Sequence, residues 1–145
     1  MIVVGRGFCF EDLKVGFRFR THRRTIREAD LAGFIALTGL TEELFAVRQE
    51  KQLGPGALVY SFAEGLLLPT MQDTGLAFLN ASLDVKAPTM VGDTIHVEAE
   101  VTEHRLTSKG DRGLVRFANK VVNQSGETVL EYNPLRLLKR NNTKV

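Results

Sequence analysis

The segment at residues 57–68 is apolar at almost every position, and it constrains the fold of this chain more than any other feature. Only Tyr60, Ser61 and Glu64 interrupt it. A helix that is apolar on every side must be buried on every side. We expect the helix to end at Pro69, because the residue before a proline avoids the helical region. The segment therefore predicts a central helix that other elements enclose.

Much of the remaining chain alternates apolar and polar residues, which is typical of strands with one buried face. Such segments lie at residues 15–21, 79–86, 95–102, 115–121, 127–132 and 135–138. Short turns separate the later ones, and one-sided alternation with short turns indicates antiparallel pairing. Because the central helix needs cover all round, we expect an α+β fold in which an antiparallel sheet wraps around it.

A first helix is expected before the central one. Thr25 and Glu28 match a capping box, in which each side chain bonds the other's free backbone N–H. An apolar stripe continues to Thr38, and Gly39 supplies the left-handed residue that ends such a helix. A further short helix is expected within residues 41–52, before the break at residues 54–56.

The composition is that of one globular domain over residues 1–145, with 43% hydrophobic and 25% charged residues. A net charge of +2 does not favour a nucleic-acid partner. The apolar runs are too short for a membrane span and no secretory signal is visible, so we expect a cytoplasmic protein without a membrane partner. Cys9 is the only cysteine and the three histidines lack metal-ligand spacing, so we expect no metal or cofactor.

Several stretches, in this order and spacing, resemble the MaoC-like, (R)-specific enoyl-CoA hydratase family of hotdog proteins. They are residues 10–16, 29–39, 54–56 with 61–66, and 87–94. The resemblance implies a hotdog fold and a thioester ligand, an acyl chain on coenzyme A or on acyl carrier protein. It also implies a homodimer or higher homo-oligomer, in which two sheets join edge to edge and ligands lie near the interface.

The sequence departs from this family at the residues of the reaction. Family members carry an Asp and a His just after a Thr-Gly pair, and these supply the acid and base of hydration. Here Leu40 stands at the Asp position and Phe45 at the His position. Neither side chain can carry a proton. The resemblance therefore predicts the fold and the ligand class better than the reaction.

Two residues remain as catalytic candidates. By the resemblance, the Gly56 N–H polarises the thioester carbonyl as an oxyanion hole does, whereas the simpler interpretation is a glycine that a tight turn requires. Glu64 lies in an otherwise apolar helix, and an unpaired buried carboxylate would shift its pKa and could act as a base. The alternative for Glu64 is a carboxylate at the helix rim that reaches solvent or an arginine.

Other residues are candidates for substrate binding. We expect the acyl chain to lie along Leu40, Phe45 and the central helix, with Tyr60 and Ser61 offering hydroxyls to the ligand. Tyr60 could equally belong to the core. A basic cluster is either a solvated face or a landing patch for a phosphorylated ligand; it comprises Arg18, Arg20, Arg23, Arg24 and Arg27.

Three functions stay open from the sequence. The first is an acyl-CoA-binding protein with hydratase or dehydratase activity, in which Glu64 is the base. The second is a non-catalytic thioester-binding protein, or one subunit of a hetero-oligomer with an intact hydratase chain. The third is an acyl-CoA thioesterase. A tunnel that reaches Gly56 and Glu64 would favour a protein that binds or transforms a thioester. A pocket plugged by Phe45 would favour a non-catalytic, inert module.

Overall fold

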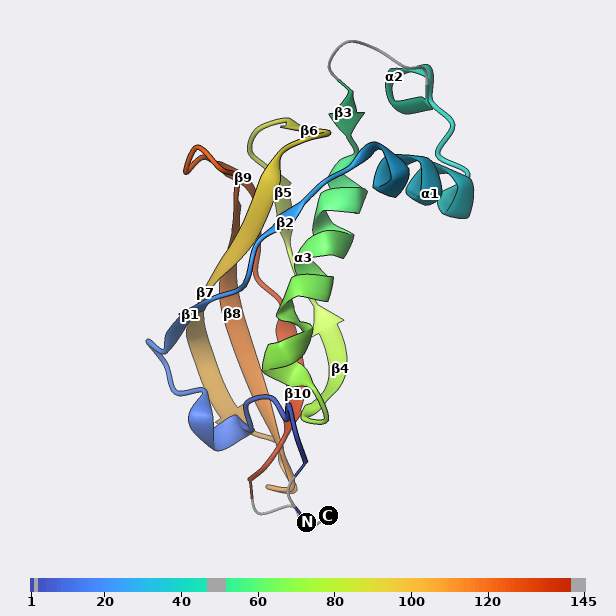
Figure 1. The fold of residues 1–145 in the computed structure, drawn as a ribbon. Helices are drawn as coiled ribbons and strands as arrows, with labels where there is room; N and C mark the ends of the chain where they lie inside the picture. The colour runs from blue at the N-terminus through green and yellow to red at the C-terminus, as the bar shows by residue number, and fades with distance from the viewer. Residues whose placement is uncertain (2, 47–51, 142–145) are drawn as a thin grey trace.

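The computed structural model describes residues 1, 3–46 and 52–141 (Figure 1). Its elements, in chain order, are η1 (Phe10–Asp12), β1 (Arg18–Arg20), β2 (Arg24–Thr25), α1 (Glu28–Thr38), α2 (Glu43–Ala46), β3 (Leu53–Gly54), α3 (Gly56–Met71), β4 (Gly75–Asn80), β5 (Leu83–Val85), β6 (Thr89–Met90), β7 (Thr94–Leu106), β8 (Arg112–Val122), β9 (Thr128–Tyr132) and β10 (Leu135–Lys139).

The expected α+β architecture is confirmed. Figure 1 shows α3 lying along one face of a curved antiparallel sheet. The strand order is β1-β7-β8-β10-β4, and β9 pairs with both β8 and β5. The helix buries Leu58, Val59, Phe62, Ala63 and Leu67. These side chains share one core with inward residues of β7, β8 and β9.

The central helix differs from its prediction in two ways. It is not buried all round, because the sheet covers one side and leaves Ala57, Ser61, Gly65 and Leu68 exposed. It also continues through Pro69 to Met71. A proline inside a helix removes one hydrogen bond, to the carbonyl four residues earlier, and here residues 65 and 69 are both exposed to water. The N-terminal segment supports the last turn, where Phe8 N–H donates to the Thr70 carbonyl at 2.8 Å.

The first helix begins two residues later than the capping box predicts, with Arg27 rather than Thr25 as its N-cap residue. The Arg27 N–H donates to the Asp30 carboxylate at 2.9 Å. Thr25 lies in β2 instead, with its hydroxyl 2.7 Å from that of Thr94. The prediction of Gly39 as the terminating residue is confirmed by its φ of 73°. Of the short helix expected within residues 41–52, the structure shows α2, and residues 47–51 lie outside the described part of the chain.

The strands follow the predicted order with local differences. Residues 15–21 contribute only the short β1. The predicted strand at 79–86 overlaps two strands, β4 and β5, which are exposed at every residue. β4 pairs with β10 and β5 pairs with β9, and Pro134, which has no N–H to donate, lies between β9 and β10. The result is a long uncovered edge at one side of the sheet.

A second core closes the end of the sheet near η1. It joins Phe10 and Leu13 to inward residues of β7, β8 and β10. The Phe10 ring lies directly over Gly113 and stacks on the His104 imidazole, with ring centroids 3.8 Å apart. The His104 Nε2 lies 2.9 Å from the Phe10 carbonyl oxygen. This contact fixes the N-terminal segment over the hairpin of β7 and β8.

Replacing Gly113 with Ala is expected to lower the free energy of unfolding by about 1–3 kcal/mol, the usual cost of overpacking. A Cβ atom at this position would overlap the Phe10 ring. Urea denaturation of the variant measures the loss. In a Phe10→Ala background the same substitution should cost less, and an equal cost in both backgrounds would contradict the contact.

Candidate functional site

An apolar cavity of about 380 Å³ lies at the N-terminal end of α3. Its walls come from Phe45 of α2, from β3 and the start of α3, from the segment joining β5 to β6, and from β9. The described lining residues are Phe45, Leu53, Gly54, Pro55, Gly56, Val59, Val85, Lys86, Ala87, Pro88, Thr89, Val129 and Leu130. None of them carries a carboxylate, an imidazole or a thiol. Lys86 is the one ionisable residue among them, and its Nζ lies 4.0 Å from the Glu131 carboxylate.

Gly56 is the first residue of α3, immediately after the N-cap residue Pro55. Its N–H has no acceptor within its own helix, and the aligned peptide dipoles make this end of the helix partially positive. Gly56 is absent from the glycines with positive φ, so a tight turn is not what requires a glycine here. A Cβ atom would lie 3.1 Å from Cγ2 of Val85. A side chain at this position would therefore crowd Val85, which also lines the cavity.

The turn at residues 90–93 directly follows Thr89, which lines the cavity. Met90 N–H donates to the Asp93 carboxylate at 2.9 Å, and Asp93 N–H donates to the Met90 carbonyl at 3.0 Å. Gly92 has a φ of 100°, which favours glycine. The Asp93 carbonyl also accepts the N–H of Ile26. The family-like stretch at residues 87–94 thus has a structural role, which is to place β6 against β3.

Phe45 and Leu40 are placed differently. Phe45 is half-buried and lines the cavity without filling it. Its position is set by its N–H, which donates to the Glu42 carbonyl, and by the Gln52 side-chain amide, which donates to the Phe45 carbonyl at 3.1 Å. Leu40 is half-buried after the end of α1 and is not among the lining residues. Of these two expected acyl contacts, the structure brings only Phe45 to the cavity.

Glu64 does not meet Gly56. The two residues are eight positions apart in α3, a rise of about 12 Å along the helix axis. The Glu64 carboxylate accepts hydrogen bonds from Arg136 Nη1 at 2.9 Å, from Arg136 Nη2 at 2.6 Å and from the Tyr132 hydroxyl at 2.7 Å. The Arg136 side chain is only 6% exposed. Of the alternatives for Glu64, the geometry matches the carboxylate that reaches an arginine.

The two tyrosines beside this ion pair stay neutral and belong to the core. Burial, followed by the Glu64 carboxylate, raises the pKa of Tyr132 far above its usual value. Burial and Glu64 also raise the pKa of Tyr60, whose ring packs edge-on against Tyr132 at a centroid distance of 5.0 Å. The Ser61 hydroxyl donates to the Ala57 carbonyl of its own helix at 2.8 Å. Neither Tyr60 nor Ser61 lines the cavity.

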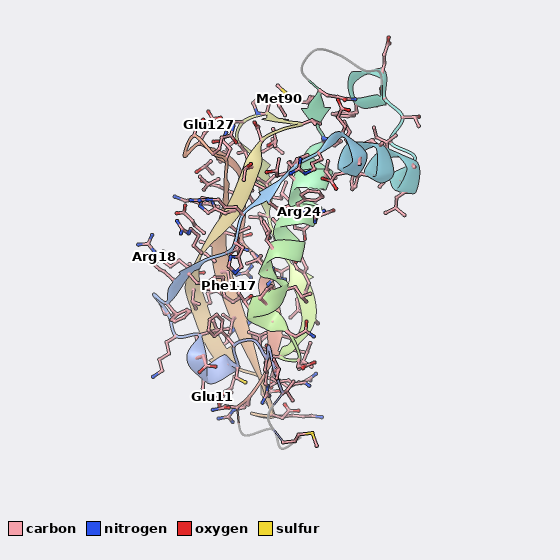
Figure 2. All side chains as sticks on the ribbon, viewed as in Figure 1. Glu11, Arg18, Arg24, Met90, Phe117 and Glu127 are labelled. Atoms are coloured by element: carbon pink, nitrogen blue, oxygen red, sulfur yellow. The ribbon has the colours of Figure 1, made fainter. Side chains whose placement is uncertain are left out.

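The basic cluster of the N-terminal strands is interleaved with carboxylates. Arg18 and Arg20 lie opposite Glu100 and Glu98 across the β1–β7 ladder. Arg24 lies 3.4 Å from Asp30, and its guanidinium stacks 3.9 Å from the centroid of the Phe62 ring. Figure 2 shows Arg18 and Arg24 far apart along this part of the chain. The arrangement matches a solvated face better than a phosphate site.

No helix within the described residues is long and apolar enough to cross a lipid bilayer. No protein-family model matches the chain. The sequence is 30% identical over 123 residues to an (R)-specific enoyl-CoA hydratase of Aeromonas caviae, an alignment that covers 80% of this chain and 88% of that protein.

Solved structures show the same fold. The monoamine oxidase regulatory protein from Archaeoglobus superposes with a TM-score of 0.82 at 26% identity, covering 94% of this chain and 97% of that one. A Mycobacterium tuberculosis protein with a double hotdog fold superposes with a TM-score of 0.83 at 22% identity. That match covers 99% of this chain and 48% of the other, so this chain corresponds to one of its two hotdog units. The expected hotdog fold is confirmed.

Replacing Glu64 with Ala is expected to lower the free energy of unfolding by about 3–5 kcal/mol, because it leaves the buried Arg136 charge without a partner. The double variant Glu64→Ala/Arg136→Met should recover part of this loss. Tyr132→Phe removes one donor to a charged acceptor and should cost about 1.5–3 kcal/mol. Chemical denaturation gives all three values. A loss below 1 kcal/mol for Glu64→Ala would contradict the ion pair.

Proposed function

The chain belongs to the (R)-specific enoyl-CoA hydratase family of MaoC-like hotdog proteins, and from this premise we propose that it binds an acyl thioester, carried by coenzyme A or acyl carrier protein, at the cavity beside Gly56. The observation that carries the proposal is the apolar cavity that is lined by Gly56, the first residue of α3. A thioester carbonyl at the N–H of this residue would be polarised by a preorganised donor at a helix N-terminus.

The acyl chain has an apolar surface to follow from that point. Val59 and Leu130 are buried residues of the cavity, and Phe45 contributes an aromatic wall. An acyl group placed there would leave water, which favours binding by roughly 25 cal/mol for each Å² of apolar surface buried. Because the cavity persists beside Phe45, a plugged and inert pocket is the less supported alternative.

Hydration needs an acid and a base that the cavity does not supply from its described residues. The two family positions hold Leu40 and Phe45, and neither exchanges protons at neutral pH. Glu64, the candidate base for hydration and for thioester hydrolysis, is held by three donors and lies about 12 Å along α3 from Gly56. We therefore favour thioester binding without hydration by this chain alone.

A second hotdog unit is expected to join the sheet at the β4 edge. β4 ends the strand order, so its outer backbone groups lack a partner strand in the described chain. Large apolar side chains are exposed along β4 and β5, namely Leu76, Phe78, Leu79, Leu83 and Val85. An uncovered apolar edge of this kind promotes pairing with another chain. A second copy would give a homodimer, and an intact hydratase chain would give a hetero-oligomer with its own acid and base.

The role of the Gly56 N–H can be tested with two substitutions at one position. Gly56→Ala keeps the N–H and adds a Cβ atom, whereas Gly56→Pro adds a ring and removes the N–H. Proline is tolerated at the first residue of a helix, and the extended conformation of Pro55 is compatible with a following proline. Calorimetry should show crotonyl-CoA binding about two- to tenfold weaker for Gly56→Pro than for Gly56→Ala, the worth of one hydrogen bond. Equal affinities would argue against this N–H as a ligand donor.

The wild-type chain is expected to bind crotonyl-CoA without hydrating it, as followed by the absorbance of the enoyl thioester. The double variant Leu40→Asp/Phe45→His restores the acid and base of the family and is expected to gain hydration. Wild-type turnover that disappears in Glu64→Gln would overturn this view and make Glu64 the base. Co-expression with an intact hydratase chain, followed by co-purification, tests the hetero-oligomer.

A further inference from the structure

Asn119 is a polar residue on the inward, buried face of β8. It alternates along the strand with the buried residues Phe117 and Val121, and it is only 3% exposed. Within the described part of the chain, its Oδ1 atom is fully buried and has no hydrogen-bond partner. Buried polar atoms of folded proteins nearly always have a partner, which is either a protein group or an ordered water molecule. This oxygen therefore requires a donor that the described residues do not supply.

The orientation of the Asn119 amide follows from the residue across the ladder. Asn119 lies directly opposite Tyr132 in the β8–β9 pairing, so the two side chains lie on the same face of the sheet. The Tyr132 hydroxyl donates its one hydrogen to Glu64, and it can therefore only accept from Asn119. Burial and Glu64 raise the pKa of Tyr132, whereas a hydrogen bond from Asn119 lowers it, as a donor does. The amide nitrogen thus faces Tyr132, which leaves the oxygen as the atom that needs a donor.

A small cavity adjoins Asn119 between the last turns of α3 and the sheet. The space there that is open to the centre of a water molecule is about 10 Å³. Roughly 10–15 Å³ of such space is enough for one water molecule, so a larger ligand is excluded. Thr70 of α3 and Arg136 of β10 are the other polar lining residues, and the rest of the lining is apolar.

The chemistry of this lining also selects a neutral ligand. The Thr70 hydroxyl donates to the Leu67 carbonyl at 2.6 Å, so Thr70 Oγ1 can serve a ligand as an acceptor. The Arg136 guanidinium has five N–H groups, and two of them donate to Glu64, so it can serve a ligand as a donor. The positive charge of Arg136 disfavours a cation, and the two oxygen acceptors disfavour an anion. A small molecule that donates twice and accepts once fits this set.

We propose that one water molecule is bound in this cavity as a fixed part of the fold, donating to Asn119 Oδ1 and Thr70 Oγ1 and accepting from Arg136. Three hydrogen bonds are the usual number for a buried water molecule. The water ties β8 and β10 to the last turns of α3. Because Arg136 also holds Glu64, the water joins Asn119, Arg136 and Glu64 in one polar network beneath the helix. The site does not depend on the proposed thioester ligand.

High-resolution crystal structures of the full chain test this site directly. We expect an electron-density peak within about 3.2 Å of Asn119 Oδ1, of Thr70 Oγ1 and of an Arg136 nitrogen. Asn119→Leu keeps the approximate size of the side chain and removes its polar atoms, so the peak should disappear. A wild-type cavity without a peak would overturn the proposal, and so would a peak that persists in Asn119→Leu.

Magnetic relaxation dispersion of the water oxygen nucleus tests the site in solution, because it counts water molecules that stay bound for longer than the protein takes to tumble. We expect the wild type to hold one more such water molecule than Asn119→Leu, and equal counts would contradict the proposal. Thr74→Val is the matched control. Among the described residues, Thr74 Oγ1 is also buried without a partner, but Thr74 does not line this cavity, so the count should not change.

Thr70→Val keeps the test decisive if Asn119→Leu does not fold. This substitution replaces the hydroxyl with a methyl group of similar size and removes one of the two acceptors. The residence time of the water should become about two- to tenfold shorter, the worth of one hydrogen bond. An unchanged residence time in Thr70→Val would overturn the proposed set of three hydrogen bonds.

Discussion

The packing of one side of α3 against the concave face of the sheet is the interaction on which the rest of the structure depends. It buries Leu58, Phe62 and Leu67 in a shared core with β7, β8 and β9. The same packing fixes both ends of the helix. The first end brings Gly56 to the apolar cavity, and the last end receives the N-terminal segment through the Thr70 carbonyl. The site is therefore a consequence of the core.

The half-buried carboxylate of Glu64 is the one charged group of this apolar helix. Glu64 is held by Arg136 and Tyr132, which come from β10 and β9, so one ion pair ties the helix to two strands. A buried charge with full hydrogen bonding constrains a packing arrangement, whereas an unpaired one is costly. This accounts for an acidic residue in the central helix without assigning it a chemical step. It also keeps this carboxylate away from the described lining of the cavity at Gly56.

The surfaces that the core leaves uncovered are as informative as the core itself. One side of α3, most of α1 and the edge formed by β4 and β5 all present apolar side chains to water. Monomeric proteins rarely leave continuous apolar faces of this kind exposed. Figure 1 places α1 and β4 on the same side of the molecule, so one partner unit could contact both. These faces support the proposed pairing with a second hotdog unit.

Local patterns in the sequence determined the order of the elements, including the central helix and the antiparallel strands from β7 to β10. They also determined the end of α1 at Gly39. Side-chain periodicity and left-handed glycines act over a few residues, so they can be recognised without the fold. The prediction that Thr25 caps α1 was wrong. Thr25 fits the capping pattern, but its hydroxyl is hydrogen-bonded to that of Thr94, 69 residues away. The partners of Glu64 lie 68 and 72 residues from it, and the exposure of one side of α3 depends on where the sheet stops. Only the tertiary structure decided these, because contacts between distant segments exist only after the chain has folded.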